Sequence, residues 1–364
     1  MIAYEISATH PHRHFISFRA IFPVEGRSTI PIKIAAWRPG RYELGNFSKN
    51  IRAWRATNTQ GEQLSFTKSD KDTWQVQCEG EKEIVVHYQY YASELNAGSS
   101  YLDETQLHIN PVNCFFYDGD HLQQDYDLRF RLPDEYDIAC QLTSRGPHHL
   151  YAHSFDELAD SPLIASPSLT KHEYRAGDIP FYIHAQGPWN MDTSRLLSDF
   201  RAFSTLQIDI FGSIPCSKYD FLYQFPPYFV RHGVEHSAST VIAMGPASEL
   251  GGEKLYNELL AISCHELFHT WNIKCIRPAA MLPYDFSKEN YSPLGYVYEG
   301  VTTYYGDLVL LRCGVWSRER WLATFSDEVK THLENPGIFN HSVSDSSMDT
   351  WLDGYGQGIP WRKV

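Results

Sequence analysis

The 364-residue sequence predicts an α+β protein, with a β-rich N-terminal domain over residues 1–170 and a largely helical domain over residues 171–364. Before about residue 190, several segments alternate apolar and polar residues with the period of two that is typical of strands. After that point, apolar residues recur every three or four positions, as they do in amphipathic helices. The length fits two domains of ordinary size, and a hydrophobic share of 43% supplies a large core.

The strands predicted in the first half are rich in β-branched and aromatic residues, and clusters of Gly, Pro, Asp and Asn separate them. Short strands at this spacing are typical of a β-sandwich or a saddle-like β domain. In chain order, the segments are 15–23, 29–37, 72–78, 82–93, 126–133 and 181–187.

The first predicted helix, residues 191–212, places Leu196, Phe200 and Phe203 on one face, and Asp192 or Thr193 can cap its start. Turn and break residues bound the later elements: a Gly-Gly pair, two prolines and a Gly. These elements are strands at 219–225 and 239–244, and helices at about 253–270, 295–312 and 317–334.

Composition excludes several functional classes. Thirty-one basic against 44 acidic residues give a net charge of −13, which argues against nucleic acid as the main partner. No segment approaches the 18 consecutive apolar residues of a membrane span. Seven scattered cysteines without CxxC spacing argue against a disulfide framework or a thiolate zinc site. The N-terminal residues do not resemble a signal peptide, so we expect a cytoplasmic protein with no membrane partner.

The stretch SCHELFHTWN, residues 263–272, contains the pattern His-Glu-x-x-His. On a helix His265 and His269 lie four residues apart, so both imidazoles project from one face and can bind the same Zn²⁺ ion. Glu266 follows the first histidine and can reach a water molecule held at the metal, to act as general base. The pattern fixes only three residues and also occurs by chance, so a third ligand is needed to support it.

Two glutamates compete for the place of third ligand. Glu289 lies in a Pro-containing polar loop, whereas Glu299 begins the following predicted helix. A helix holds a ligand more rigidly than a loop does, which favours Glu299 and leaves Glu289 as the alternative.

The segment HELFHTWNIKCIRP, followed by YEGVTTYYGDL, resembles the glycyl aminopeptidase family of zinc metallopeptidases. The early stretch AAWRPGRYELGNFSKNIRAW, residues 35–54, resembles the N-terminal domain of the same family. The resemblance implies a thermolysin-like catalytic domain and usually a PDZ domain, with His265, His269 and Glu299 as zinc ligands and Glu266 as general base. It also implies a peptide substrate with a free N-terminus and a preference for Gly or Ala.

The stretch RHGVEHSAST, residues 231–240, resembles the segment in which such enzymes bind the substrate's α-amine, and Glu235 is the counterpart of the amine-binding glutamate. His232 and Val234 depart from the family pattern and put the local backbone geometry in question. A carboxylate facing the metal would pair with an ammonium group and make the enzyme an exopeptidase. The alternative is an exposed glutamate in a turn.

Relatives carry an oxyanion-stabilising tyrosine beyond the third ligand, in a Tyr-x-Lys-Gly-like segment that this sequence does not reach. We therefore expect a catalytic domain truncated at its C-terminus and lacking the PDZ domain. Tyr304, Tyr305 and Tyr355 are possible substitutes for the missing donor.

The sequence thus predicts a zinc-dependent aminopeptidase that removes small N-terminal residues. Two alternatives remain: a non-catalytic, zinc-containing peptide-binding or scaffold protein, and a zinc endopeptidase if Glu235 does not face the metal.

Overall fold

The computed structural model describes residues 1–353, and its chain divides into two compact units. The first unit comprises Met1–Arg38 and Leu44–Leu169, and the second comprises Pro39–Glu43 and, among the described residues, everything from Thr170 onward. The short segment Pro39–Glu43 therefore belongs to the second unit although both of its flanking stretches belong to the first.

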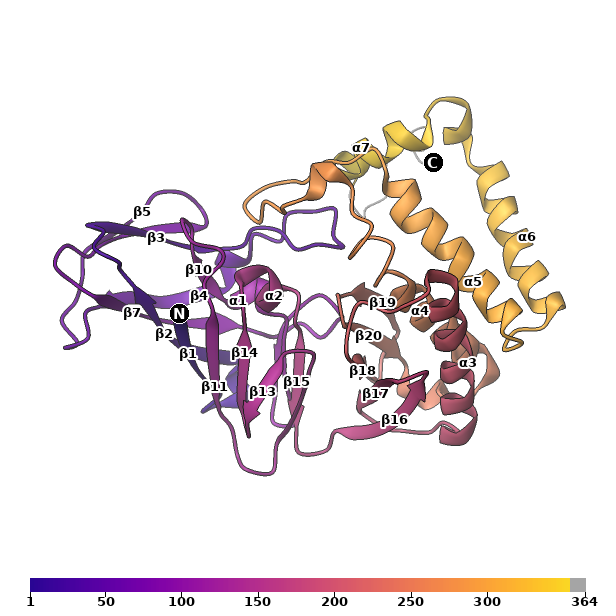
Figure 1. Ribbon diagram of the computed structural model, residues 1–364, viewed down its shortest axis with the longest axis horizontal. Helices are drawn as coiled ribbons and strands as arrows, with labels where there is room; N and C mark the ends of the chain where they lie inside the picture. The colour runs from indigo at the N-terminus through magenta and orange to yellow at the C-terminus, as the bar shows by residue number, and fades with distance from the viewer. Residues whose placement is uncertain (354–364) are drawn as a thin grey trace. The chain divides into compact units, whose positions relative to one another are not determined.

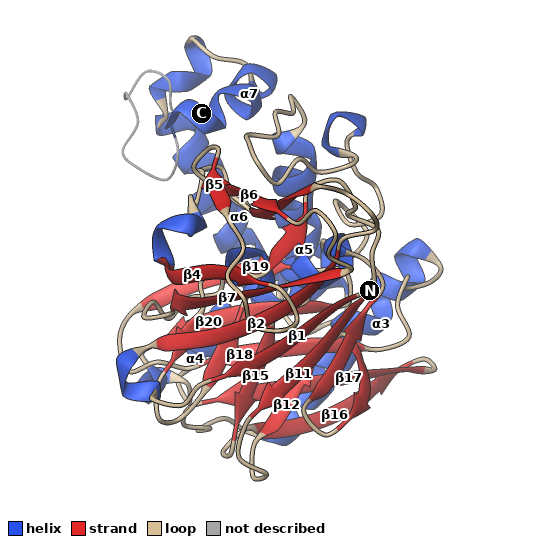
Figure 2. Cartoon of the chain, turned by 90° about the vertical axis from the view of Figure 1, so that its left-hand side faces the viewer, coloured by secondary structure: helices blue, strands red, loops and turns tan. Residues whose placement is uncertain are grey.

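The first unit is built from strands, two short α-helices and two 3-10 helices, Pro11–Arg13 and Phe47–Asn50 (Figure 1). Its strands form a seven-stranded sheet in the order β13-β14-β11-β1-β2-β7-β4 and two four-stranded sheets, β10-β3-β6-β5 and β12-β15-β9-β8. Figure 2 shows β4, β7, β2, β1 and β11 side by side in the largest sheet. The strands are β1 Ile2–Ser7, β2 Phe15–Pro23, β3 Thr29–Ile34, β4 Ile51–Thr57, β5 Phe66–Lys68, β6 Thr73–Gln77, β7 Glu83–Tyr91, β8 Tyr101–Leu102, β9 Leu107–Ile109, β10 Phe116–Asp118, β11 Tyr126–Arg131, β12 Asp137–Cys140, β13 Thr143–Gly146, β14 His149–Ala152 and β15 Leu163–Ser166, and the helices are α1 Pro111–Cys114 and α2 Phe155–Ala159.

Aromatic side chains pack between the seven-stranded sheet and the sheet that contains β6 and β10. Trp54 of β4 stacks on Trp74 of β6 with ring centroids 5.4 Å apart, and Tyr88 of β7 meets Phe116 of β10 at 4.6 Å. Such pairs add about 0.5–1.5 kcal/mol each beyond the burial of their area. Of these four strands, the sequence predicted β6 and β7, whereas β4 and β10 were not among the predicted segments.

The second unit contains a five-stranded sheet in the order β16-β17-β18-β20-β19. The pairs β17–β18 and β18–β20 are parallel, whereas the two edge strands pair antiparallel with their neighbours. The strands are β16 Thr170–Ala176, β17 Ile179–Gln186, β18 Tyr219–Gln224, β19 Val230–Glu235 and β20 Ser239–Gly245.

Helices α3 and α4 pack against this sheet (Figure 1): α3 contacts β16, α4 contacts β19 and β20, and α5 packs on α4. Phe200 of α3, Leu259 of α4 and Leu310 of α5 are among the fully buried residues of the shared core. Asp192 caps α3, because its Oδ1 accepts hydrogen bonds from the backbone N–H groups of the first turn. The helices are α3 Thr193–Phe211, α4 Glu253–Phe268, α5 Thr302–Arg312, α6 Arg318–Glu334 and α7 Val343–Asp353, and a π-helix spans Tyr296–Val301.

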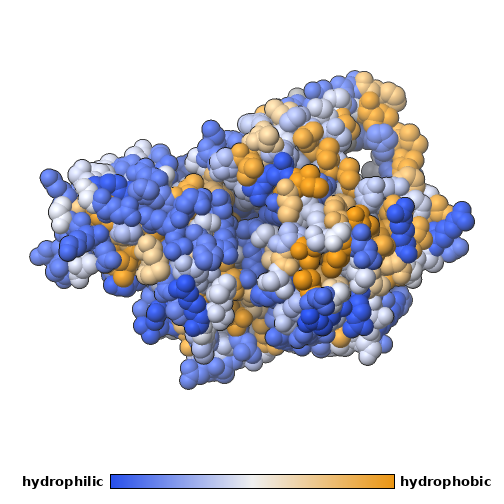
Figure 3. All heavy atoms as spheres, viewed as in Figure 1, coloured by the Kyte–Doolittle hydropathy of each residue, from blue (hydrophilic) through white to orange (hydrophobic). Residues whose placement is uncertain are grey.

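Helix α6 buries none of its residues. Leu322, Phe325, Val329 and Leu333 share one face of it and are exposed, and Figure 3 shows hydrophobic atoms along this helix. Within residues 1–353, no helix is long and apolar enough to cross a membrane.

The structure confirms an α+β chain with a β-rich first half and helices concentrated in the second. Most predicted bounds differ from the observed ones by one to three residues, and two of these differences concern the helices that carry the candidate ligands. The helix expected over 253–270 ends at Phe268, and the helix expected over 295–312 begins as a π-helix before α5. A π-turn widens the helix by one residue per turn, a feature that periodicity alone does not reveal, and such turns are frequent at functional sites.

Candidate metal and hydrolase site

His265 and His269 lie at the C-terminal end of α4, and their Nε2 atoms are 2.9 Å apart. Glu299 lies in the π-helix, and its Oε2 is 3.7 Å from Nε2 of His265 and 3.6 Å from Nε2 of His269. The helical spacing of the two histidines and the turn that carries Glu299 thus bring three potential ligand atoms around one point.

These separations fit a zinc ion. Tetrahedral zinc with bonds of about 2.0–2.1 Å places neighbouring ligand atoms roughly 3.3 Å apart. The outer nitrogens of both imidazoles also have partners: Nδ1 of His269 lies 3.0 Å from the carbonyl oxygen of Asn272, and Nδ1 of His265 lies 3.4 Å from Oγ1 of Thr303. Such partners orient the rings so that each Nε2 faces the metal position.

The charges around this point are strongly coupled. Burial by itself raises the pKa of Glu299, but hydrogen bonding to His265 and the charges of both histidines outweigh it and lower the pKa to about 2. Burial lowers the pKa of His269 below its usual value. Burial acts in the same direction on His265, but the hydrogen bond to Glu299 and the charge of Glu266 raise its pKa overall. Glu299 is therefore an anion at neutral pH, as a metal ligand must be.

Glu266 is buried beside the two histidines, with 6% of its surface exposed. Among the residues that the structure describes, its Oε2 atom has no hydrogen-bond partner. Burial is the main cause that raises the pKa of this carboxyl to about 8, and the charges of Glu235 and Glu299 act in the same direction, against that of His265. A buried carboxylate with an open acceptor and a pKa near neutrality suits a general base.

Gly233 of β19 explains how strand and helix approach so closely here. A Cβ atom at this position would lie 2.1 Å from Oε1 of Glu266 and 2.7 Å from its Cδ. A side chain at this position would therefore displace the Glu266 carboxylate.

Glu235 ends β19, at the edge of the sheet, and is 8% exposed. Its carboxylate belongs to a group with Glu266 and His269 whose potential ligand atoms all lie within 4.8 Å of one another. The structure therefore places Glu235 next to the predicted general base. The residues His232 and Val234, which depart from the family pattern, do not move Glu235 away from it.

In residues 1–353, only two groups of three His, Cys, Asp or Glu side chains have all their potential ligand atoms within 4.8 Å of one another. These groups are His265–His269–Glu299 and Glu235–Glu266–His269. Glu289, the alternative third ligand, is in neither. Tyr304 and Tyr305 contact each other, and Tyr305 also stacks on Phe268. Tyr355 lies outside the described residues.

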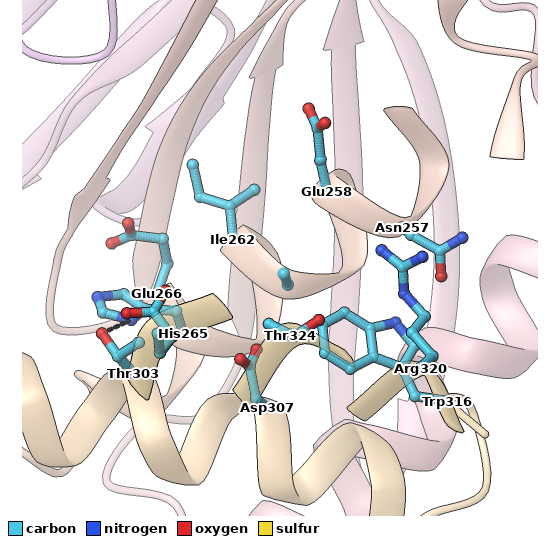
Figure 4. A pocket seen from close by; sticks show the side chains of 12 residues that line it. Asn257, Glu258, Ile262, His265, Glu266, Thr303, Asp307, Trp316, Arg320 and Thr324 are labelled. Carbon is cyan, nitrogen blue, oxygen red and sulfur yellow. Dashed lines mark hydrogen bonds between the residues drawn. The ribbon is translucent and has the colours of Figure 1, made fainter. Parts of the chain in front are cut away.

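A cavity of about 430 Å³ opens beside His265 and Glu266 (Figure 4). Figure 4 shows Glu258 and Ile262 of α4 and Asp307 of α5 along it. Burial, followed by the charge of Glu328, raises the pKa of Asp307 to about 6. The cavity therefore combines acidic side chains with Arg320 and apolar groups such as Trp316, and it opens next to the buried Glu266 carboxylate.

Tyr42 is a site residue that the sequence did not reveal as functional. Its hydroxyl donates a hydrogen bond to Oε1 of Glu299, 257 positions away in the sequence. Burial raises the pKa of this phenol, and the negative charge of Glu299 adds to the effect, so the hydroxyl remains a donor. The only sequence signal was its place in the WRPGRY stretch, residues 37–42, where nothing indicated a contact with residue 299.

Two family models match this chain. Residues 3–167 match the family model of the peptidase M61 N-terminal domain, and residues 258–363 match that of the M61 glycyl aminopeptidase. The comparison with curated proteins found no match.

Several solved structures are similar to this chain. An aminopeptidase N family protein from Idiomarina loihiensis superimposes with a TM-score of 0.91 at 29% identity, over 97% of this chain and 62% of the other. The present chain thus spans less than two thirds of that protein. An M1 zinc metallopeptidase from Deinococcus radiodurans has a TM-score of 0.55 at 12% identity, over 97% and 78% of the two chains, and shares the fold. A mutant of that enzyme bound to a Tyr-Ser-Ala substrate has a TM-score of 0.53 at 12% identity, over 90% and 74%.

The two family models lie in order along the chain, one on the β-rich part and the other on the part that carries His265, His269 and Glu299. This chain belongs to the M61 glycyl aminopeptidase family.

Proposed function

We propose that this protein is a zinc-dependent aminopeptidase that removes small N-terminal residues, glycine or alanine, from peptides. In this proposal, residues 171–364 form a thermolysin-like catalytic domain and residues 1–170 form the β-rich domain, in a cytoplasmic protein. The observation that carries the proposal is the convergence of His265, His269 and Glu299 on one point, next to the buried carboxylate of Glu266.

His265, His269 and Glu299 would hold a single zinc ion, since two imidazoles and a carboxylate form a ligand set that leaves a position open for substrate or water. When bound, zinc supplies a Lewis acid that polarises the peptide carbonyl and makes a water molecule acidic enough to attack it. Zinc in the M1 relatives supports the choice of this metal.

Glu266 would take a proton from the attacking water and return it to the departing amine nitrogen. Its open Oε2 acceptor and its raised pKa support the first step, because the carboxylate can hold a proton near neutral pH. The close approach of Gly233 limits the positions that the carboxylate can occupy. A base held in this way contributes about 10²- to 10⁴-fold to the rate.

Glu235 would bind the α-ammonium group of the substrate. Its carboxylate shares a cluster with Glu266 and His269, so an ammonium group bound there brings the first peptide bond of a substrate to the general base. Charge-assisted hydrogen bonds from an ammonium to a carboxylate are roughly twice as strong as neutral ones. This placement favours an exopeptidase over an endopeptidase.

The substrate class rests on the relatives. The M1 mutant was crystallised with a Tyr-Ser-Ala peptide, and the matching family model is described as a glycyl aminopeptidase. The proposed preference for glycine or alanine is therefore based on membership of the family.

The test is the Glu266→Gln variant, assayed with alanine p-nitroanilide and for zinc content. We expect one zinc per chain in both proteins and loss of hydrolysis in the variant, whereas Glu253→Gln, at the exposed start of α4, should behave as the wild type. A wild type that binds zinc and hydrolyses neither free nor N-acetylated substrates would support the scaffold alternative. Equal hydrolysis of both substrates would support an endopeptidase.

A further inference from the structure

The segment Pro39–Glu43 packs with the second unit although its neighbours on both sides pack with the first. It thus brings two residues from the N-terminal part of the sequence, Gly40 and Tyr42, to carboxylates of the proposed site. Neither residue has a role in the function proposed above.

Tyr42 is hydrogen-bonded to one of the two oxygens of the Glu299 carboxylate. Its hydroxyl donates to Oε1 at 3.1 Å, whereas Oε2 is the atom that faces Nε2 of His265 and His269. The side chain of Glu299 is 41% exposed, and the Tyr42 hydroxyl is one of the polar groups that meet its carboxylate. A donor fixed on one oxygen keeps the other oxygen directed at the metal position.

The ring of Tyr42 is itself held in place within the second unit. It stacks on the ring of Tyr298, the residue before Glu299, with ring centroids 6.4 Å apart and an angle of 11° between the planes. It also makes an edge-to-face contact with the ring of Trp351, with centroids 6.2 Å apart and 75° between the planes. The phenol is therefore a rigid donor rather than a mobile surface group.

Gly40 makes the corresponding contact with the second carboxylate. Its φ of +72° is in the left-handed region that favours glycine, and a Cβ atom there would lie 2.7 Å from Oε2 and 3.0 Å from Oε1 of Glu235. The backbone of the segment thus packs directly against both oxygens of the proposed amine-binding group. A side chain at this position would displace the carboxylate.

We propose that the segment Pro39–Glu43 is part of the catalytic centre: Tyr42 is a positioning residue for the metal ligand Glu299, and Gly40 allows Glu235 to occupy the amine-binding position. This inference rests on the proposed function, because it takes Glu299 as a zinc ligand and Glu235 as the amine anchor.

Zinc affinity tests the role of Tyr42 without reference to catalysis. The variant Tyr42→Phe keeps the ring and removes the donor, and we expect its Kd for zinc, measured by competition with a chromophoric chelator on the metal-depleted chain, to rise about 10- to 100-fold. Tyr304→Phe, which removes a hydroxyl from the exposed face of α5, should leave the Kd unchanged.

The outcomes of this titration distinguish a failure of the proposed function from a failure of the positioning role of Tyr42. A wild type that binds no zinc overturns the proposed function and this inference with it. A wild type that binds zinc while Tyr42→Phe binds it equally well overturns the inference alone. A variant with unchanged zinc Kd but reduced kcat at saturating zinc would show that Tyr42 acts on the reacting atoms, which also contradicts a positioning role.

The role of Gly40 is tested by Gly40→Ala against Gly26→Ala. Both glycines have a positive φ, +72° and +77°, but nothing lies within 4 Å of a Cβ at Gly26. The control therefore carries the same backbone strain without the contact. We expect Gly40→Ala to raise KM for alanine p-nitroanilide at least 10-fold with an unchanged zinc Kd, and Gly26→Ala to leave both unchanged. Equal KM values for the two variants would overturn this part of the proposal.

Discussion

We expect a methyl group added at Gly233 to displace the proposed general base while leaving the proposed metal site intact. A Cβ there would lie 2.1 Å from Oε1 of Glu266, whereas ordinary van der Waals contact begins at 3.4 Å. In Gly233→Ala the carboxylate must therefore retreat from 2.1 Å to 3.4 Å, a movement of about 1.3 Å. The clashing atoms are the far end of a flexible side chain, so the chain should fold and only the position of the base should change.

A displacement of about 1 Å can cost roughly 100-fold in rate, because a catalytic group must lie within hydrogen-bond reach of the proton that it takes. We expect kcat/KM of Gly233→Ala for alanine p-nitroanilide to fall about 100-fold, with the Kd for zinc and the melting temperature close to those of the wild type. The three atoms nearest to the new methyl group all belong to Glu266.

The matched control is Gly300→Ala, since a Cβ atom at Gly300 has nothing within 4 Å. This variant should retain the activity and zinc affinity of the wild type. The reasoning would be refuted if Gly233→Ala kept most of its activity, or if it lost zinc and activity together.

Three further predictions concern ligand choice, acid stability and helix capping. Glu299→Gln should weaken zinc binding at least 10-fold in a chelator competition, and Glu289→Gln should not; the reverse would move the third ligand to the loop. Burial raises the pKa of Asp118, but its ion pair with Arg27 and other hydrogen bonds outweigh burial and leave the pKa below its usual value. The ion pair therefore stabilises the fold above about pH 4, and this stabilisation is lost as the pH falls through the lowered pKa. Arg27→Met should therefore cost about 3 kcal/mol in urea unfolding at pH 7 and progressively less toward pH 2; a difference independent of pH would contradict the assignment. Asp192→Ala removes the cap of α3 and should cost about 1 kcal/mol in the same assay, whereas no loss of stability would show that the cap contributes little.

The sequence predicted much of the fold because local periodicity reports local structure. The strands 15–23, 82–93 and 126–133 and the helices at 191–212 and 253–270 appear in the structure within a few residues of the predicted bounds. The approach of His265 to His269 could also be anticipated, since residues four apart share a helix face. Glu299 was preferred to Glu289 on the argument that a helix is the more rigid mount, and the structure brings Glu299 to the histidines.

The contacts between distant residues could not be predicted in this way. Tyr42 and Glu299 are 257 positions apart, and no periodic pattern connects them. The left-handed backbone at Gly40 and the π-helix around Glu299 depend on tertiary packing that a single sequence does not display. In the sequence, Gly233 was only one residue of the short stretch that resembles the amine-binding segment. The position of Glu266 in the structure explains why a glycine fits there.

The anomalous scattering of zinc in crystals of the zinc-loaded protein tests the central claim most directly, because the structure holds two groups that share His269. Our account predicts one peak within about 2.3 Å of Nε2 of His265, Nε2 of His269 and Oε2 of Glu299, with the Glu266 carboxylate outside bonding distance. A peak bound instead by Glu235, Glu266 and His269 would make the proposed base and amine anchor metal ligands, and would contradict the account.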